Sequence, residues 1–415
     1  MNAPDPPPAA VPPSRPTAAA PLPSTFASLR TMPVWPLVAT LAVQTFATMA
    51  LFSVPTAAPE IARDLHVPGS LIGVFVSLVY GVGIVSAVLS PNFIRRYGAV
   101  RVTQITLLAV TGMLGLAALG SLMSLALGAI VLGLAYGAIA PASTHLLVPQ
   151  TPRPVFNLVM SLRQIGVPLG GVLGALIVPP IAVAFGWRTA LLAELVPVLL
   201  VLVLMERPRA TWDSDRDPSW RLWDGALMQP VRLLAADRRL RGLSVASFIY
   251  SGVQLCFIAF MTVQLTSVVR IDLVRAGVAL AAYQVAGALS RPVWGWVADR
   301  YLSPARMLSV LGFAMAGAAL AVGAFGARWP WSVVLLTALI AGLTASGFTG
   351  VAYAEYARLG GARRTETTGL GTASMFAGVM LLPPLFGAAV TLLGGWFLPY
   401  AALAVLAAGS ALLLW

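Results

Sequence analysis

The chain has 415 residues, of which 59% are hydrophobic and 10% are charged, and its formal net charge is +12. Soluble domains contain about 45–50% apolar and about 25% charged residues, so this composition excludes an ordinary soluble protein. All 26 basic residues are Arg, and they lie between apolar runs rather than on one soluble face, which argues against nucleic-acid binding. The single cysteine, Cys256, excludes an intrachain disulfide and a thiolate cluster, and we expect neither a metal nor a cofactor.

Residues 1–32 are rich in proline and alanine and are predicted to form a disordered cytoplasmic tail rather than a signal peptide. From residue 33 onward, apolar segments of about 20 residues follow one another, and this is the length that crosses a bilayer as a helix. They are predicted at 34–56, 70–90, 102–121, 123–147, 156–183, 188–205, 243–265, 274–296, 307–327, 331–356, 368–392 and 396–415. The sequence therefore predicts an all-α membrane protein with twelve transmembrane helices.

One polar interruption is longer than the others and divides the helices into six and six. It covers 206–241 with eight Arg and six acids, and residues 223–236 are predicted to form a short helix on the membrane surface. The predicted organisation is an N-terminal bundle at 33–205, a cytoplasmic central loop at 206–241 and a C-terminal bundle at 242–415. The segments GVFVSLVYGVG (73–83) and GVALAAYQVAG (277–287) are similar, which indicates two related halves.

The distribution of arginine predicts the orientation. If the N-terminus is cytoplasmic, 19 Arg fall on the cytoplasmic side and five fall outside, while Arg163 and Arg291 lie within helices. This asymmetry satisfies the positive-inside rule. We therefore expect a multi-pass protein of the cytoplasmic membrane with both termini in the cytoplasm.

Four motifs occur in order along the chain: VPTAAPEIARDLHVPGSLIG (54–73), GVPLGG (166–171), FGWR (185–188) and GWVADR (295–300). Together with the six-plus-six pattern, they resemble the major facilitator superfamily over residues 33–415. The resemblance implies a secondary transporter that works by alternating access. It also implies the following gate and motif residues: Gly166, Pro168, Gly170, Gly171, Gly295, Asp299 and Arg300, with Arg95 and Arg96 in the equivalent loop of the first half.

The sequence departs from the family pattern at three places. In the first-half loop PNFIRRYG (91–98), the family's glycine is Pro91 and its aspartate is Arg95, so the acidic gate residue is present only as Asp299. Gly133 stands where proton-coupled drug antiporters of the family carry an Arg, and the first helix has no acid. These departures weaken the hypothesis of a drug exporter, although GVPLGG favours it.

Two arginines inside predicted helices are the main candidates for substrate binding. Arg163 lies about 10 Å inside the fifth helix, and Arg291 lies about 12 Å deeper than Asp299 along the eighth. A buried cation needs a counter-charge, which a bound carboxylate supplies in bidentate geometry. The setting SRPVWGWVADR (290–300) also resembles the monocarboxylate and oxalate/formate branches of the family. Alternatively, Arg163 reaches the headgroups and Arg291 belongs to the gate.

Other polar side chains of the predicted helices are candidates for the cavity lining or for helix-to-helix hydrogen bonds. His145 is also a candidate for proton coupling. The set is Gln44, His145, Gln164, Tyr250, Gln254, Tyr283 and Gln284.

Transport of a small organic anion is the leading hypothesis, and export of drug-like or other hydrophobic compounds is the alternative. We expect a small-molecule substrate, protons or a counter-ion as coupling partner, a lipid environment, no nucleic acid and a monomer. The absence of lysine excludes the phosphate loop G-x-x-x-x-G-K-[ST]. A membrane-embedded enzyme would need a cluster of catalytic side chains, and a solute sensor would need a soluble output domain; neither pattern is present.

Overall fold

The computed structural model describes residues 32–67, 70–223, 228–327 and 329–415, so nearly all of the predicted N-terminal tail lies outside the described residues. These residues are helical and contain no strand. The helices of the first half are α2 (Val34–Thr56), α3 (Ala58–Leu65), α4 (Ser70–Tyr97), α5 (Ala99–Ala118), α6 (Leu122–Tyr136), α7 (Ile139–Leu147), α8 (Phe156–Arg163), α9 (Gly166–Phe185), α10 (Trp187–Ala193), α11 (Leu195–Leu204) and α12 (Glu206–Trp212).

The second half begins after a short helix, α13 (Met228–Ala236). Its helices are α14 (Arg238–Gln264), α15 (Leu273–Arg300), α16 (Pro304–Gly323), α17 (Trp331–Ala345), α18 (Thr349–Gly360), α19 (Arg364–Leu393) and α20 (Phe397–Leu414). The π-helical turn η3 (Leu265–Val269) and the 3₁₀ turns η1 (Val148–Gln150), η2 (Arg153–Val155) and η4 (Gly361–Arg363) complete the order.

The described helices are consistent with twelve membrane passes. Ten helical stretches are long and apolar enough to span a bilayer. One of them, 331–393, has 63 residues and is too long for a single pass; it contains α17 and α18 and then α19. Helix α15 is not among the ten, but it has 28 residues and lies within the bundle. Counting the long stretch twice and adding α15 gives twelve.

Four of the predicted helices are interrupted, which the apolar pattern did not indicate. The interruptions fall between α6 and α7, between α8 and α9 at Gln164 and Ile165, at Glu194, and between α17 and α18. Pro168 lies in the first turn of α9, just after the interruption at Gln164 and Ile165, and as a proline it has no N–H to donate to the oxygen of Gln164 four residues earlier. At two of these interruptions, the backbone carbonyls of Gln164 and Ser346 accept hydrogen bonds from a side chain. At a third, the side chain of Glu194 is buried inside the bundle.

The predicted central loop is shorter in the structure than 206–241. Helix α12 continues almost directly from α11, and α14 already begins at Arg238. Between them, the carboxylate of Asp213 accepts the backbone N–H groups of Val100 (2.7 Å) and Arg101 (3.0 Å) and so caps α5. Burial raises the pKa of this carboxyl, although the two N–H donors oppose the shift. The loop is thereby fixed to the first half.

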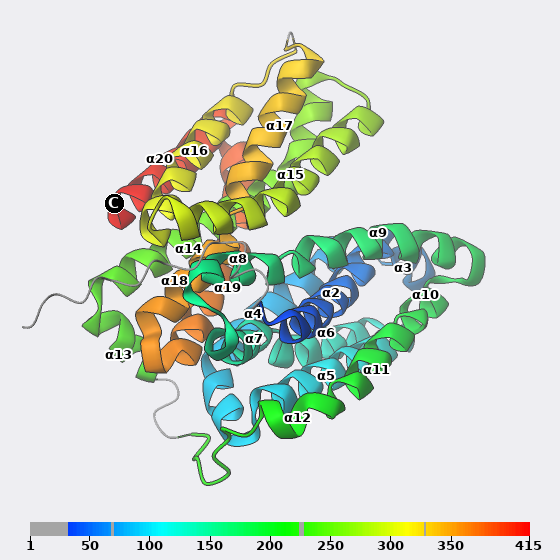
Figure 1. The fold of residues 1–415 in the computed structure, drawn as a ribbon. Helices are drawn as coiled ribbons and strands as arrows, with labels where there is room; N and C mark the ends of the chain where they lie inside the picture. The colour runs from blue at the N-terminus through cyan, green and yellow to red at the C-terminus, as the bar shows by residue number, and fades with distance from the viewer. Residues whose placement is uncertain (1–31, 68–69, 224–227, 328) are drawn as a thin grey trace, which may run out of the picture.

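The two bundles meet at one end and diverge at the other (Figure 1). The meeting end, which we call the arginine-rich end, carries the loops that hold most of the arginines; there α8 packs against α15 and α18, and α7 packs against α19. The other end, the arginine-poor end, carries α3 and the α16–α17 connection. At that end Asp64 pairs with Arg188 (2.8 Å), which joins two of the sequence motifs.

Candidate functional site

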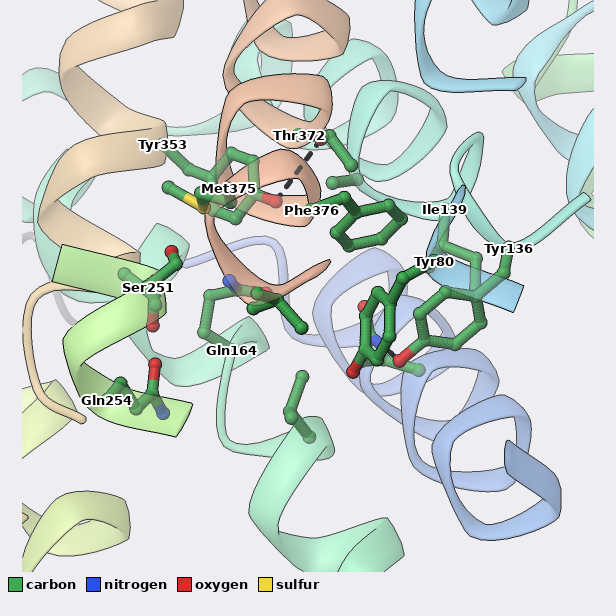
Figure 2. A pocket seen from close by; sticks show the side chains of 15 residues that line it. Tyr80, Tyr136, Ile139, Gln164, Ser251, Gln254, Tyr353, Thr372, Met375 and Phe376 are labelled. Atoms are coloured by element: carbon green, nitrogen blue, oxygen red, sulfur yellow. Dashed lines mark hydrogen bonds between the residues drawn. The ribbon is translucent and has the colours of Figure 1, made fainter. Parts of the chain in front are cut away.

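A cavity of about 100 Å³ lies between the two halves at the middle of the helices. Figure 2 shows the rings of Tyr80, Tyr136 and Phe376 gathered on one side of it and Gln164, Ser251 and Gln254 on the other. The first half contributes Gln44, Tyr80, Tyr136, Ile139, Ala140, Gln164 and Val167, and the second half contributes Ser251, Gln254, Thr349, Tyr353, Thr372, Met375, Phe376 and Val379.

The aromatic side joins three helices from both halves. The ring of Phe376 on α19 lies 4.9 Å from that of Tyr80 on α4 and 5.8 Å from that of Tyr136 on α6, measured between centroids. The Tyr80–Phe376 contact is edge-to-face and the Tyr136–Phe376 contact is stacked, and both are favourable geometries for aromatic pairs. This wall suits a planar or apolar part of a ligand.

Arg163 lies behind the cavity wall and is fully buried. One Nη atom donates to Oε1 of Gln44 at 2.8 Å, and the guanidinium lies over the ring of Tyr353, 5.6 Å from its centroid. Its Nε and its other Nη have no hydrogen-bond partner. A buried guanidinium with unmade hydrogen bonds is costly, and an anion that reached it would satisfy the free donors.

Arg291 is equally buried, but protein groups occupy its donors. Its Nε donates to the backbone oxygen of Ser346 at 3.0 Å, and one Nη donates to the hydroxyl of the same residue at 3.2 Å. The other Nη donates to the backbone oxygen of Gln164. Ser346 and Gln164 lie at helix interruptions in opposite halves, so Arg291 connects the two halves through their backbone carbonyl groups.

Neither guanidinium forms an ion pair with any Asp or Glu of the described residues. Glu355, which is also buried, pairs instead with Arg358. The centre of the bundle therefore holds two cationic groups without a protein carboxylate beside them. This arrangement favours an anionic ligand.

The other predicted lining residues divide into two groups. Gln44, Gln164 and Gln254 line the cavity, and Gln254 donates to the Ser346 hydroxyl at 3.2 Å. Away from it, the Tyr250 hydroxyl donates to the oxygen of Leu308, the Tyr283 hydroxyl donates to the oxygen of Gln254, Gln284 is partly exposed on α15, and His145 lies at the arginine-rich end.

The arginine-rich end is closed by contacts between the halves. The carboxylate of Asp299 accepts the backbone N–H groups of Asn157 (3.0 Å) and Leu158 (2.9 Å), so it caps α8 from the opposite half. Gly295 packs so closely on Ser161 that a Cβ would overlap it. In the predicted gate motif, Asp299 therefore binds the N-terminus of α8.

Two polar contacts lie beside this cap. Arg95 pairs with Glu366 at 3.7 Å. The ring of His145 contacts the Thr365 hydroxyl through Nδ1 (2.9 Å) and the Asp215 carboxylate through Nε2 (2.7 Å), so it joins the first half, the central loop and α19. Arg96 donates to the oxygen of Trp220 in the same loop, and Arg300 ends α15 nearby.

The glycine motif of α9 serves helix packing. A Cβ at Gly166 would meet Gln44, and one at Gly170 would meet the backbone of Thr45 and Met49. The glycines thus allow α9 to lie directly on α2, while Gly171 faces the ring of Phe52 more loosely.

A second cavity of about 420 Å³ lies toward the arginine-poor end, between α4 of the first half and α14 and α19 of the second. It shares Tyr80 and Val379 with the central cavity, and the rest of its lining is largely apolar, with Phe260 and Pro383 among its residues. The two cavities therefore adjoin at Tyr80 and Val379.

Sequence reasoning did not identify Tyr80, Tyr136, Tyr353 and Phe376 as lining residues. Helices that are apolar nearly all round give no periodicity to show which face meets the cavity. The repeat that aligns Tyr80 with Tyr283 was an available signal, but only Tyr80 lines the cavity.

Comparisons with known proteins place this geometry in a wider group. The family description Major Facilitator Superfamily matches residues 40–357 and 243–415. The 4-hydroxybenzoate transporter PcaK of Acinetobacter baylyi is 29% identical over 150 residues, which are 36% of this chain and 33% of that protein. The chain thus matches about a third of the length of this relative.

Two solved structures have a similar fold at low sequence identity. The transporter FucP in its outward conformation has a TM-score of 0.72 at 15% identity, covering 92% of this chain and 98% of that chain. The human organic anion transporter MFSD10 has a TM-score of 0.71 at 15% identity, covering 95% and 100%. At these identities the likeness shows the fold alone.

Proposed function

The chain belongs to the major facilitator superfamily and is a multi-pass membrane transporter, and we propose that it moves a small organic anion by alternating access. The observation that carries the proposal is Arg163. It is fully buried, two of its nitrogen atoms have no hydrogen-bond partner, and no Asp or Glu of the described residues forms an ion pair with it. A carboxylate matches a pair of guanidinium N–H groups on one edge, and both such edges of Arg163 include the Nη2 atom that now donates to Gln44, so displacement of Gln44 would free them.

The anion would reach Arg163 through the central cavity. Gln44 and Tyr353 lie both in the cavity wall and against Arg163, so a small displacement of the Gln44 side chain would expose the guanidinium. The amide of Gln44 also donates to Thr48 (3.0 Å) and to the Tyr136 hydroxyl (3.4 Å), which gives it alternative partners after such a displacement.

The aromatic wall favours an anion with a planar apolar part. Tyr80, Tyr136 and Phe376 stand across the cavity from the polar groups. The relative PcaK is described as a transporter of 4-hydroxybenzoate, which is an aromatic carboxylate. We therefore propose aromatic or similar monocarboxylates as the substrate class.

We also propose that the protein is a monomer in the cytoplasmic membrane and that its arginine-rich end faces the cytoplasm. The arginine distribution supports this orientation. The closed arginine-rich end and the second cavity toward the opposite end then support an outward-facing conformation. Phosphatase fusions test the orientation: a fusion after residue 270 should be active, and activity after residue 222 would contradict it.

Ligand binding by the purified protein tests the substrate class. Thermal-shift and binding measurements with benzoate, 4-hydroxybenzoate, amino acids, sugars and cationic drugs should show stabilisation by the carboxylates. Uptake of the same carboxylates into proteoliposomes should follow. Stabilisation by cationic drugs without any carboxylate response would contradict the proposal.

Export of hydrophobic compounds is the second candidate. The cavity at the arginine-poor end favours it, because Leu255, Phe260, Met380 and Pro383 give it an apolar wall. Under this alternative, neutral apolar compounds would bind and Arg163→Gln would leave their binding unchanged.

A further inference from the structure

One acidic side chain lies inside the first bundle, away from the central cavity. Glu194 occupies the interruption between α10 and α11, and its backbone N–H donates to the oxygen of Leu191 at 3.2 Å. It is seven residues after Trp187, about 10 Å along the helix. Only 2% of the residue is exposed. The carboxyl group is therefore at membrane depth and out of contact with water.

Neither oxygen of the Glu194 carboxyl has a hydrogen-bond partner among the described groups. The Ser53 hydroxyl of α2 lies within hydrogen-bonding reach of the carboxyl, but its proton is donated to the oxygen of Met49 at 2.8 Å, so its oxygen is left as an acceptor for a carboxylic O–H. The other acids that are buried in the described residues differ in this respect. Glu355 and Glu366 pair with arginines, and Asp213 accepts two backbone N–H groups.

No cation compensates Glu194 from the elements packed around it. Helices α2, α9 and α11 contain no charged residue. Helix α10 contains only Arg188, which pairs with Asp64 of α3, and α5 contains only Arg101 in its first turn, which pairs with Glu206 of α12. The other charged residues of α3 and α12 are also accounted for. Arg63 pairs with Glu60, Arg209 pairs with Glu206, and Arg207 is exposed.

An ionised carboxylate in such a place would lack water, hydrogen-bond donors and a counter-ion at once. The protonated acid avoids that cost and keeps one O–H to donate. The surroundings of Glu194 therefore favour its protonated form in this conformation.

Helix α2 connects this acid to the central site. Ser53 and Gln44 both lie on buried positions of α2, nine residues apart, and Gln44 accepts from Arg163. Displacement of Gln44 by an anion would therefore act on the same helix that packs on Glu194. This link rests on the function proposed above.

We propose that Glu194 is the proton-binding site of the transporter and that one proton moves with each monocarboxylate. The carboxyl holds its proton in the conformation described here and exchanges it with water when α2 moves against α10 and α11 as the opposite end opens. A proton and a monocarboxylate together carry no net charge, so the transported pair is electrically neutral.

Infrared spectroscopy of the reconstituted protein tests the bound proton without any substrate. At neutral pH, the spectrum should contain the C=O stretching band of a protonated carboxylic acid, and Glu194→Gln should remove it. Glu355→Gln is the matched control, because Glu355 is equally buried but paired with Arg358, and the band should remain. A spectrum without the band, or one in which Glu194→Gln leaves it in place, would overturn the proposal.

Transport tests the coupling. With an acidic exterior, proteoliposomes that contain the wild-type protein should accumulate benzoate. Those that contain Glu194→Gln should accumulate at least tenfold less benzoate, while their exchange of benzoate at equal pH on both sides should continue. Glu194→Asp should retain pH-driven accumulation in part, which provides a second variant if the glutamine protein folds poorly. Accumulation by Glu194→Gln within twofold of the wild type would overturn the proposal. If the wild type transports no carboxylate but shows the infrared band, the anion proposal fails while the protonated acid stands.

Discussion

Arg163 and Arg291 are chemically identical and equally buried, yet their surroundings differ. Arg163 donates to Gln44 and keeps two nitrogen atoms free, whereas Arg291 has partners at Nε and at both Nη atoms. The first arrangement is incomplete without a ligand, and the second is complete within the protein. The difference indicates that burial of a charge does not by itself identify a binding site, and the unmade hydrogen bonds are the reason that Arg163, rather than Arg291, is the proposed anion-binding residue.

The largest effect is expected from Arg163→Gln. Loss of one partner of a buried charged pair costs about 2–5 kcal/mol, so carboxylate affinity should fall by roughly 30-fold or more. Calorimetric titration of the purified protein with benzoate measures this. Gln44→Ala, which removes a group that the anion would displace, is the control and should bind as well as the wild type or better.

Arg291→Gln should change the balance of conformations rather than the binding of substrate. Its hydrogen bonds hold Ser346 and Gln164 together across the halves, and a charged hydrogen bond contributes about 1.5–3 kcal/mol, or roughly 10–100-fold in the population ratio. A cysteine at Ser161, in a Cys256→Ala background, reports opening of the arginine-rich end because Ser161 is fully buried there. Labelling should become faster. Unchanged labelling together with lost affinity would reverse the roles of the two arginines.

Asp299→Asn should open the same end to a smaller degree. The asparagine keeps one acceptor oxygen for the N-terminus of α8 but loses the charge and the second acceptor. We expect a cost of about 1.4 kcal/mol, which is roughly a tenfold change in the labelling rate of the Ser161 cysteine. Carboxylate affinity should fall far less than in Arg163→Gln. If Asp299→Asn is labelled at the same rate as the wild type, Asp299 does not help to keep this end closed.

Asp215→Asn should have the smallest effect. The Asp215 side chain is 54% exposed where it meets His145, and exposed ion pairs contribute at most about 1 kcal/mol. The labelling rate should therefore change less than about fivefold. A larger change would mean that the central loop, and not the contact between α8 and α15, holds the end shut.

Much of the fold was predictable because the bilayer imposes a simple length rule. The apolar runs and the family resemblance agree with the described helices and with the family match, while the division near residue 206 stays a prediction. The interruptions at Gln164, Glu194 and Ser346 were not predicted, because each falls within a stretch long and apolar enough to be taken for one membrane-spanning helix, and an isolated polar residue in such a stretch does not mark a break. Tertiary contacts help to stabilise the breaks. Arg291 shows this clearly, since it binds two of these positions.

The candidate site was predictable in its charges but not in its walls. An arginine within an apolar run is conspicuous in sequence, so the sequence alone predicts Arg163 and Arg291 as candidates for substrate binding. Tyr136 and Phe376 were not, because an aromatic residue in a transmembrane helix faces lipid, a neighbouring helix or a cavity with the same sequence pattern. The unpartnered state of Arg163 and of Glu194 is likewise a property of packing, which no single sequence position encodes.

The comparison of lysine variants tests the central claim most directly. Lysine keeps the positive charge but not the paired N–H geometry. We predict that Arg163→Lys loses benzoate binding by calorimetry nearly as fully as Arg163→Gln, whereas Arg291→Lys still binds benzoate. Wild-type affinity in Arg163→Lys together with lost binding in Arg291→Lys would contradict the assignment of Arg163 as the anion-binding residue.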